Sequence, residues 1–377
     1  MTNRTLVAIA GVRQPDNKLV NRTPITNTEA GQLLMSGFKG VKPGDAGVEE
    51  MRTLISQGKV GSIILMGYNI VSSEQLKQLT HYLQSAAPAN SPLLISVDQE
   101  GGAVQRLTAD KGFKGFPSAA KMTEIASKDM GQVQQIYRDM ARELKAHGIN
   151  MNLGPVVDMS NSNYYIGKLK RSYGTDPAIV TRMAEAFIKA HRDEGVLTVL
   201  KHYPGKGTAP DTHIGEGNIN ATWKPEELEP FRKLASQSAG VMMGHTIHTR
   251  FSDNGLPATL SSRAYQSLRQ DVGFKGIAMS DAMDMDAIRK LAPYRDLLPA
   301  MVKAGNNMVI LPMDHNSRNH FSAGDAHETL MRASAQDPVI MQNIRASAET
   351  VRQLKEQLRS EPIQTQRKPD ASASRPT

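Results

Sequence analysis

The sequence predicts an α/β protein built as a single (β/α)8 TIM-type barrel, and three observations support this fold class. Short apolar runs of strand length recur along the chain, and stretches with helical periodicity lie between them. This alternation is typical of parallel β-α units joined by right-handed crossovers. The runs number eight, as in a closed barrel. They occupy residues 33–38, 61–66, 93–97, 149–157, 196–200, 240–243, 276–279 and 308–311.

The main competing architecture is an open, doubly wound sheet. Such a sheet normally carries a glycine-rich turn after its first strand when it binds a dinucleotide. Here the first run ends in GFKG at residues 37–40, which is not a G-x-G-x-x-G motif. The barrel therefore remains the preferred fold.

The helical stretches and the two ends define the expected domain limits. A short helix-like stretch at 30–35 leads into the first run, and longer ones follow between the later runs. Residues 1–28 are expected to form a polar lead, 29–360 the barrel and 361–377 a disordered tail, because the tail is rich in Pro, Ser and basic residues without periodicity. The longer helical stretches are 73–83, 131–147, 178–194, 226–238, 262–272 and 295–304.

Composition excludes several classes of function. The chain has 39% hydrophobic residues, and no apolar run approaches the ~18 to 20 residues of a membrane span. Its net charge is +8, but the basic residues are spread out and only 5% of residues are aromatic, so nucleic acid is not an expected partner. A solvated basic surface accounts for this charge, and an anionic partner that bears carboxylates is the alternative.

The absence of cysteine excludes disulfides, thiolate zinc sites and cysteine nucleophiles. The apolar segment LVAIAGV at residues 6–12 is short for a secretory signal and has no convincing cleavage site. We expect a cytoplasmic monomer, with a periplasmic or secreted location as the alternative if a signal segment has been removed.

The chemistry should lie in the loop that follows the fifth run, which reads KHYPGKGTAPDTH over residues 201–213. Catalytic residues in a barrel come from the carboxyl ends of the strands. Asp211 and His213 stand two residues apart, so the carboxylate can orient and charge the imidazole as a proton donor. The alternative is that His213 is a loop histidine held by a local hydrogen bond, since an Asp-x-His pair alone does not distinguish the two. Lys201 and His202 can both face the site only if the strand has broken there, which Pro204 favours.

Polar residues follow other runs in the same way. DQEGGAVQRL after the third run contains Asp98, Glu100 and Arg106, and Asp158 follows the fourth run. Asp98 and Arg106 could bind a ligand, or they could form an internal pair that closes the Gly-Gly turn. Asp158 is as suited to bracing the loops as to contacting substrate. Further candidates at strand ends or in the loops are Arg171, His245 and Asp281.

These segments together resemble glycoside hydrolase family 3, specifically its bacterial β-N-acetylglucosaminidases. The family has Lys-His-Phe-Pro-Gly-His-Gly followed by Asp-Ser-His where this chain has KHYPGKG and DTH. DQEGGAVQR, NLGPVVD, RSYGTDP and SDAMDM also match family segments, and the resemblance spans roughly residues 31–311. Two departures stand out: Lys206 occupies a position where the family usually has histidine, and the loop before Asp-x-His is one residue shorter.

The resemblance implies a role for each candidate. Asp281 would be the catalytic nucleophile, and His213, polarised by Asp211, would be the acid/base. The residues implied to hold the terminal sugar are Asp98, Arg106, Arg171, Lys201, His202 and His245. The larger β-glucosidases of the family add a second α/β sandwich domain after the barrel, and here only a tail's length remains.

The expected function is that of a retaining exo-glycosidase. It would release terminal non-reducing β-linked N-acetylglucosamine, from peptidoglycan fragments of the GlcNAc-MurNAc type, through a covalent glycosyl-Asp intermediate. No cofactor and no metal are expected, since HExxH and comparable ligand clusters do not occur. The alternatives are a β-N-acetylglucosaminide phosphorylase, a β-glucosidase on the same scaffold, or a non-catalytic protein that binds cell-wall sugars.

Overall fold

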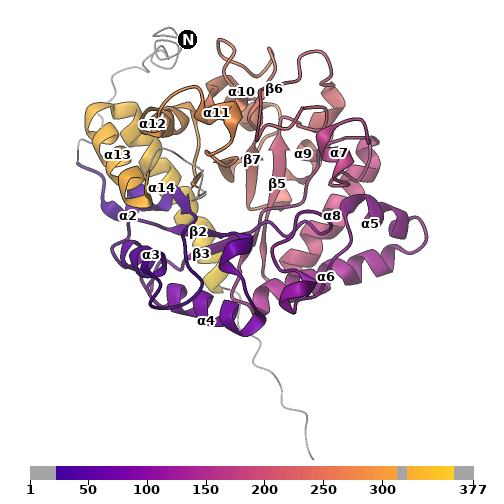
Figure 1. Ribbon diagram of the computed structural model, residues 1–377. Helices are drawn as coiled ribbons and strands as arrows, with labels where there is room; N and C mark the ends of the chain where they lie inside the picture. Colours follow the sequence, from indigo (N-terminus) through magenta and orange to yellow (C-terminus); the bar gives the residue numbers. More distant parts are fainter. Residues whose placement is uncertain (1–22, 312–320, 361–377) are drawn as a thin grey trace, which may run out of the picture.

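The computed structural model describes residues 23–311 and 321–360 of the chain (Figure 1). The expected tail at 361–377, the apolar segment at 6–12 and most of the expected lead lie outside the described residues. Within the part described, no helix has the length and apolar character needed to cross a membrane.

The described residues contain one sheet of eight parallel strands, which confirms the predicted fold class. Each strand pairs with its neighbours in the order β10-β1-β2-β3-β4-β5-β7-β9. A bridge between Met279 and Met308 and a hydrogen bond from Ser280 N to Met308 O connect β9 to β10, so the sheet curves into a nearly closed barrel. The strands are β1 (Leu34–Ser36), β2 (Ser62–Leu65), β3 (Leu94–Val97), β4 (Met151–Asn152), β5 (Leu197–Tyr203), β7 (Gly240–Met243), β9 (Ile277–Ser280) and β10 (Val309–Leu311).

Helices surround the barrel on its outside, as Figure 1 shows. They pack through apolar stripes typical of amphipathic helices, and several begin at Ser, Thr or Asp N-caps that satisfy free backbone N–H groups. The helices of six or more residues are α2 (Asn27–Gln32), α3 (Ala46–Ser56), α4 (Ser73–Gln84), α5 (Ala119–Ala126), α6 (Met130–Ala146), α8 (Pro177–Asp193), α9 (Glu229–Leu234), α10 (Ser262–Gln270), α12 (Tyr294–Ala304), α13 (Ala323–Gln336) and α14 (Pro338–Ser360).

The inside of the barrel is a packed core. One buried cluster includes an apolar side chain from every strand of the sheet, together with Val351 and Leu354 of α14. Lys355 of the same helix donates to Gly61 O at 2.8 Å, at the amino end of β2. The last helix therefore packs against the amino-terminal end of the barrel, and the carboxyl ends of the strands are left for the site.

Several predicted boundaries differ from those observed. The helix-like stretch at 30–35 is divided, because α2 ends at Gln32 and β1 begins at Leu34. The run at 149–157 forms only a two-residue strand, since Pro155 lacks the N–H that a longer ladder needs. The run at 196–200 extends to Tyr203. The stretch at 226–238 is interrupted, with α9 between two short 3-10 turns.

A second, two-stranded sheet lies outside the barrel. It pairs β6 (Gly217–Asn218) with β8 (Thr246–Ile247). It joins the loop after β5 to the loop after β7, so it ties together two of the segments that carry site residues.

Candidate active site

A cavity of about 380 Å³ lies at the carboxyl ends of the strands. Its volume falls within the ~300–1,000 Å³ typical of small-molecule sites. It brings together residues from β3, β5, β9 and the loops that follow them. Nearly all of the residues predicted to form the site line it: Asp98, Arg106, Arg171, Lys201, His202, His213 and Asp281.

The end of β5 presents two successive side chains to the cavity. Lys201 and His202 are both almost completely buried and both line it. The pairing of β5 with β7 shifts register between Lys201 and Tyr203. The sequence predicts that the strand has ended here, but β5 continues through both residues to Tyr203. The irregular pairing instead allows neighbouring side chains to face the same way.

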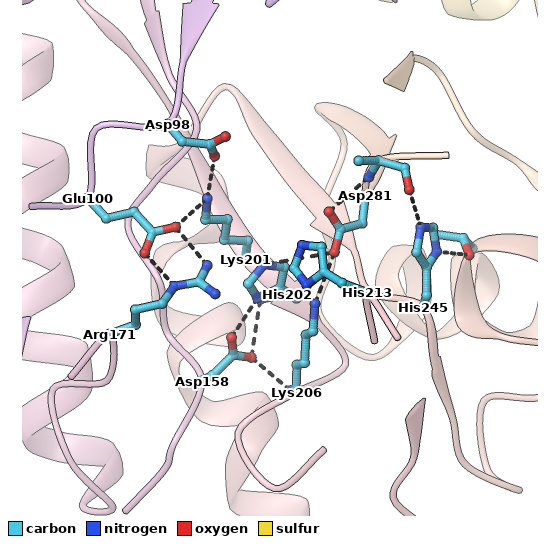
Figure 2. Close-up of polar contacts among 12 residues, drawn as sticks. Asp98, Glu100, Asp158, Arg171, Lys201, His202, Lys206, His213, His245 and Asp281 are labelled. Atoms are coloured by element: carbon cyan, nitrogen blue, oxygen red, sulfur yellow. Dashed lines mark hydrogen bonds and ion pairs between the residues drawn. The ribbon is translucent and has the colours of Figure 1, made fainter. Parts of the chain in front are cut away.

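Carboxylates and cations on one side of the cavity form a connected network (Figure 2). Arg171 donates to both oxygens of Glu100, at 2.8 Å each. The Lys201 ammonium lies 2.8 Å from Asp98 Oδ1 and 2.7 Å from Glu100 Oε1. Arg106 donates to Asp98 Oδ2 at 3.2 Å. Burial by itself raises the pKa of Glu100, but Arg171 and Lys201 together hold that pKa well below its usual range. The network is therefore ionised and offers both donors and acceptors to a polar ligand.

Asp281 lies directly after β9, and its side chain is 13% exposed. Its Oδ1 accepts from the Ala282 N–H at 2.8 Å, and its Oδ2 lies 3.2 Å from the Lys206 ammonium. His202 Nε2 is 4.0 Å from the same oxygen. Burial favours the neutral acid, but the Lys206 ammonium holds the pKa of Asp281 well below its normal value. The carboxylate is thus ready to act as a nucleophile or to stabilise positive charge.

Asp158 braces the loop after β5, which is one of the two roles expected for it. Its carboxylate accepts from His202 Nδ1 at 2.6 Å and from the Lys206 backbone N–H at 2.8 Å. Asp158 is buried and does not line the cavity. Burial lowers the pKa of His202 even though Asp158 opposes that change, so the imidazole is neutral near neutral pH.

Asp211 and His213 form the predicted pair. Asp211 Oδ1 is 2.6 Å from His213 Nδ1 and also accepts from the His213 backbone N–H at 3.0 Å. Burial raises the pKa of Asp211, but the hydrogen bonds from His213 outweigh it and the net direction is downward. The His213 side chain remains 55% exposed while it lines the same cavity as Asp281. Backbone hydrogen bonds from Asp286 and Ala287 to this loop dock it on the segment after β9.

His245 does not line the cavity, which differs from its expected contact with the sugar. It is fully buried, with Nδ1 bonded to Thr259 Oγ1 at 2.8 Å and Nε2 bonded to Ala282 O at 2.9 Å. Burial lowers its pKa to about 4, so it is neutral. Both ring nitrogens are engaged, and His245 supports the backbone that follows Asp281 instead of binding a ligand.

The cavity is also lined by residues outside the predicted set, among them Glu100, Lys206 and Tyr165. Glu100 connects Arg171 to Lys201, and its proximity to Asp98 in the sequence was the available signal. Lys206 was noted only as a departure from the family pattern. Tyr165 lines the cavity with its ring 6.2 Å from that of His213, and no motif pointed to it. Among the described residues no group of three or more His, Asp or Glu side chains could hold a metal ion.

The chain is similar in sequence to known proteins. The family described as "Glycosyl hydrolase family 3 N terminal domain" matches residues 25–354. A curated β-hexosaminidase of Alkalilimnicola ehrlichii is 34% identical over 74% of this chain and 80% of its own length. One of Tolumonas auensis is 34% identical over 69% of this chain and 78% of its own length.

The chain is also similar to solved structures. The β-N-acetylhexosaminidase of Beutenbergia cavernae superposes with a TM-score of 0.78 at 26% identity, over 89% of this chain and 100% of that chain. A family 3 β-N-acetylglucosaminidase of Paenibacillus sp. gives a TM-score of 0.79 at 28% identity, over 93% of this chain and 66% of that chain.

Proposed function

The chain belongs to glycoside hydrolase family 3 and is a β-hexosaminidase, and from this premise we propose that it removes terminal β-linked N-acetylglucosamine with retention of configuration. The proposed source of the sugar is peptidoglycan fragments of the GlcNAc-MurNAc type. The observation that carries the proposal is a single cavity lined by an ionised Asp281, by the Asp211-polarised His213 and by a charged network for sugar hydroxyls.

In the first step, a carboxylate oxygen of Asp281 attacks the anomeric carbon, and the glycosidic C–O bond breaks. The departing oxygen takes its proton from His213. This assignment is supported by the position of Asp281 at the end of a barrel strand and by its lowered pKa, which keeps the nucleophile ionised.

In the second step, a water oxygen bonds to the anomeric carbon while His213 takes its proton. The bond to Asp281 breaks, and its electron pair returns to the carboxylate. Most retaining glycosidases use a second carboxylic acid for these proton transfers. The hydrogen bond of 2.6 Å between Asp211 and His213 supports a histidine in that role here, because the carboxylate favours the charged imidazolium that must form.

The glycone is expected to lie between Asp281 and the ion network. Buried carboxylates and cations that already satisfy one another can each share further hydrogen bonds with neutral hydroxyls. Asp98, Arg106 and Lys201 are among the side chains suited to this contact, since all of them line the cavity.

A groove beside the cavity supports a carboxylate-bearing leaving group. Its volume is about 1130 Å³, and it shares Ala103 and Leu169 with the cavity. The charged residues that line it are Lys121, Glu124, Lys168 and Lys170. Three cations against one anion favour an anionic aglycone such as a muramic acid derivative.

The test uses paired chromogenic substrates, nitrophenyl β-N-acetylglucosaminide and nitrophenyl β-glucoside, each with and without phosphate. We expect rapid release from the first substrate, with free N-acetylglucosamine as the product in both buffers. A sugar 1-phosphate product would instead identify a phosphorylase, and preference for the glucoside would identify a β-glucosidase. Sugar binding without turnover of either substrate would identify a non-catalytic binding protein.

A further inference from the structure

Lys206 brings a buried ammonium group to the side of Asp281. Its side chain is only 2% exposed, and its Nζ lies 3.2 Å from Asp281 Oδ2, as the dashed line in Figure 2 marks. It lines the cavity that holds the proposed glycone. The two residues are 75 positions apart in the sequence, so the contact depends on the closed barrel.

The backbone around Lys206 is held in place, so its side chain has a defined direction. Its N–H donates to Asp158 Oδ1 at 2.8 Å, and its carbonyl accepts from Ala209 N at 3.0 Å. On either side, the backbones of Gly205 and Gly207 lie so close to Glu227 and Met159 that a methyl group could not be added. A cation in such a setting is positioned before substrate arrives.

Lys206 differs from the other buried cations of the site in its counter-ion. Lys201 contacts both carboxylates of the ion network, Asp98 and Glu100, and Arg171 contacts Glu100. The groups that influence the pKa of Asp281 are Lys206 from the loop after β5, His202 from β5, His245 from the end of β7 and the Ala282 N–H. Both histidines have lowered pKa values and are neutral at neutral pH. Among the groups that influence Asp281, Lys206 therefore supplies the full positive charge.

We propose that Lys206 is a positioning residue that acts through Asp281 in opposite directions on the two steps of the reaction. When Asp281 attacks, its electron pair enters the new C–O bond, and the carboxylate charge that the ammonium stabilises is lost. When water displaces the sugar, that electron pair returns to Asp281, and the ammonium stabilises the charge as it develops. Lys206 thus opposes formation of the covalent intermediate and promotes its hydrolysis.

This inference rests on the covalent mechanism proposed above, so the first measurement tests that mechanism separately. The anomeric configuration of the sugar at its release is followed by NMR with wild-type enzyme. Retention supports the covalent mechanism whatever Lys206 does. Inversion refutes the covalent mechanism and this inference with it.

The second measurement compares Lys206→Met with Lys206→Arg and with a surface control, Lys189→Met, whose side chain is 62% exposed on α8. Rapid-mixing assays with nitrophenyl β-N-acetylglucosaminide separate the two steps, and mass spectrometry of acid-quenched protein detects a glycosylated species. Removing one group that stabilises developing charge typically costs roughly 10²–10³-fold in the step that it assists. We therefore expect Lys206→Met to show a nitrophenol burst, an accumulated adduct and a second step slowed by about 10²-fold.

We expect Lys206→Arg to retain a second step much faster than that of Lys206→Met, and Lys189→Met to behave like wild type. The acidic limb of kcat/KM should also move to higher pH in Lys206→Met, because the pKa of Asp281 rises when its counter-ion is removed. If Lys206→Met does not fold, Lys206→Gln is used for the same measurements. Equal losses in both steps, no adduct and an unmoved acidic limb would overturn the proposal and assign Lys206 to loop structure alone.

Discussion

At the scale of single residues, the site depends on one side chain that must stay ionised and on another that must exchange a proton. Asp281 must be ionised to attack, and the lysine beside it keeps it so. His213 must exchange a proton twice in each cycle, and its exposed position at the cavity edge gives it access both to the leaving oxygen and to water. Two substitutions separate these roles.

Asp281→Asn should abolish turnover while binding of N-acetylglucosamine stays measurable. The carboxylate supplies the covalent step, whereas the ion network supplies most of the contacts expected for the sugar. Loss of a nucleophile in enzymes that form covalent intermediates can cost roughly 10⁴-fold or more. The measurements are kcat on the nitrophenyl substrate and calorimetric titration with the sugar. Turnover close to that of wild type would show that Asp281 is not the nucleophile.

His213→Ala should damage hydrolysis of a natural disaccharide far more than that of a nitrophenyl glycoside. A sugar alkoxide needs protonation to leave, and general acid catalysis contributes about 10²–10⁴-fold, whereas nitrophenolate leaves with little help. Asp211→Ala should show the same pattern more mildly, since it only orients and charges the imidazole. The ratio of kcat/KM for the two substrates gives the result. Equal losses on both would mean that His213 binds substrate or shapes the loop.

At the scale of elements, the loop after β5 packs at Gly205 against Glu227. Glu227 lies on the 3-10 turn Pro225–Leu228. Glu227 is buried, and its Oε2 has no hydrogen-bond partner among the described residues. Burial, with a contribution from Asp158, raises its pKa to about 8. This carboxyl group is therefore neutral where it packs against Gly205.

Gly205→Ala should destabilise the fold and reduce activity. Gly205 has a φ of +127°, and an added Cβ would lie 2.2 Å from Glu227 Oε2. Strain of this kind costs about 1–3 kcal/mol, and the clash would also displace the neighbouring Lys206. Urea denaturation and kcat/KM are the measurements. Gly112→Ala is the matched control, since it has a φ of +83° with no atom within 4 Å of the added Cβ, and it should lose stability without losing activity.

Glu227→Gln should change how stability depends on pH. The usual pKa of 4.5 applies in the unfolded chain, and the folded value is about 8, so between these values only the folded protein holds the proton. The contribution of Glu227 is thus fully present below pH 4.5 and is lost as the pH rises through about 8, at roughly 1.4 kcal/mol per pKa unit. Relative to wild type, the glutamine variant should gain stability as the pH rises across this range. Urea midpoints at several pH values test this, and parallel curves for the two proteins would contradict it.

At the scale of the whole molecule, a net charge of +8 is combined with a groove whose charged lining residues are mainly cationic. Long-range attraction of this kind acts on anionic ligands and is screened by salt. It should therefore influence substrates with carboxylates and leave neutral ones unaffected.

Added salt should lower kcat/KM for a muramic acid-containing disaccharide several-fold, with little effect on the nitrophenyl substrate. Replacing groove lysines, as Lys168→Gln with Lys170→Asn, should weaken that salt dependence. Asparagine is chosen because Lys170 has a φ of +56°, which asparagine adopts more readily than most residues. An equal response of both substrates to salt would argue against an anionic leaving group in the groove.

The sequence by itself determined the barrel and most of the titratable side chains that line the cavity. Buried parallel strands appear as apolar runs, and the polar residues that follow them must gather at one end of a barrel. For that reason Asp98, Lys201 and Asp281 could be assigned to one site before any contact was known. The Asp211–His213 pair was equally accessible, because its partners are two residues apart.

Only the tertiary structure decided which partner each side chain takes. Lys201 and Asp98 are 103 positions apart, and their contact follows from strand register and loop packing, which no local pattern encodes. The same reason explains His245, which follows β7 as predicted but turns into the protein to bond Thr259 and Ala282. It also explains Lys206, whose departure from the family pattern was visible in the sequence. The contact between Lys206 and Asp281 is visible only in the structure, where the closed barrel brings the loop after β5 beside the end of β9.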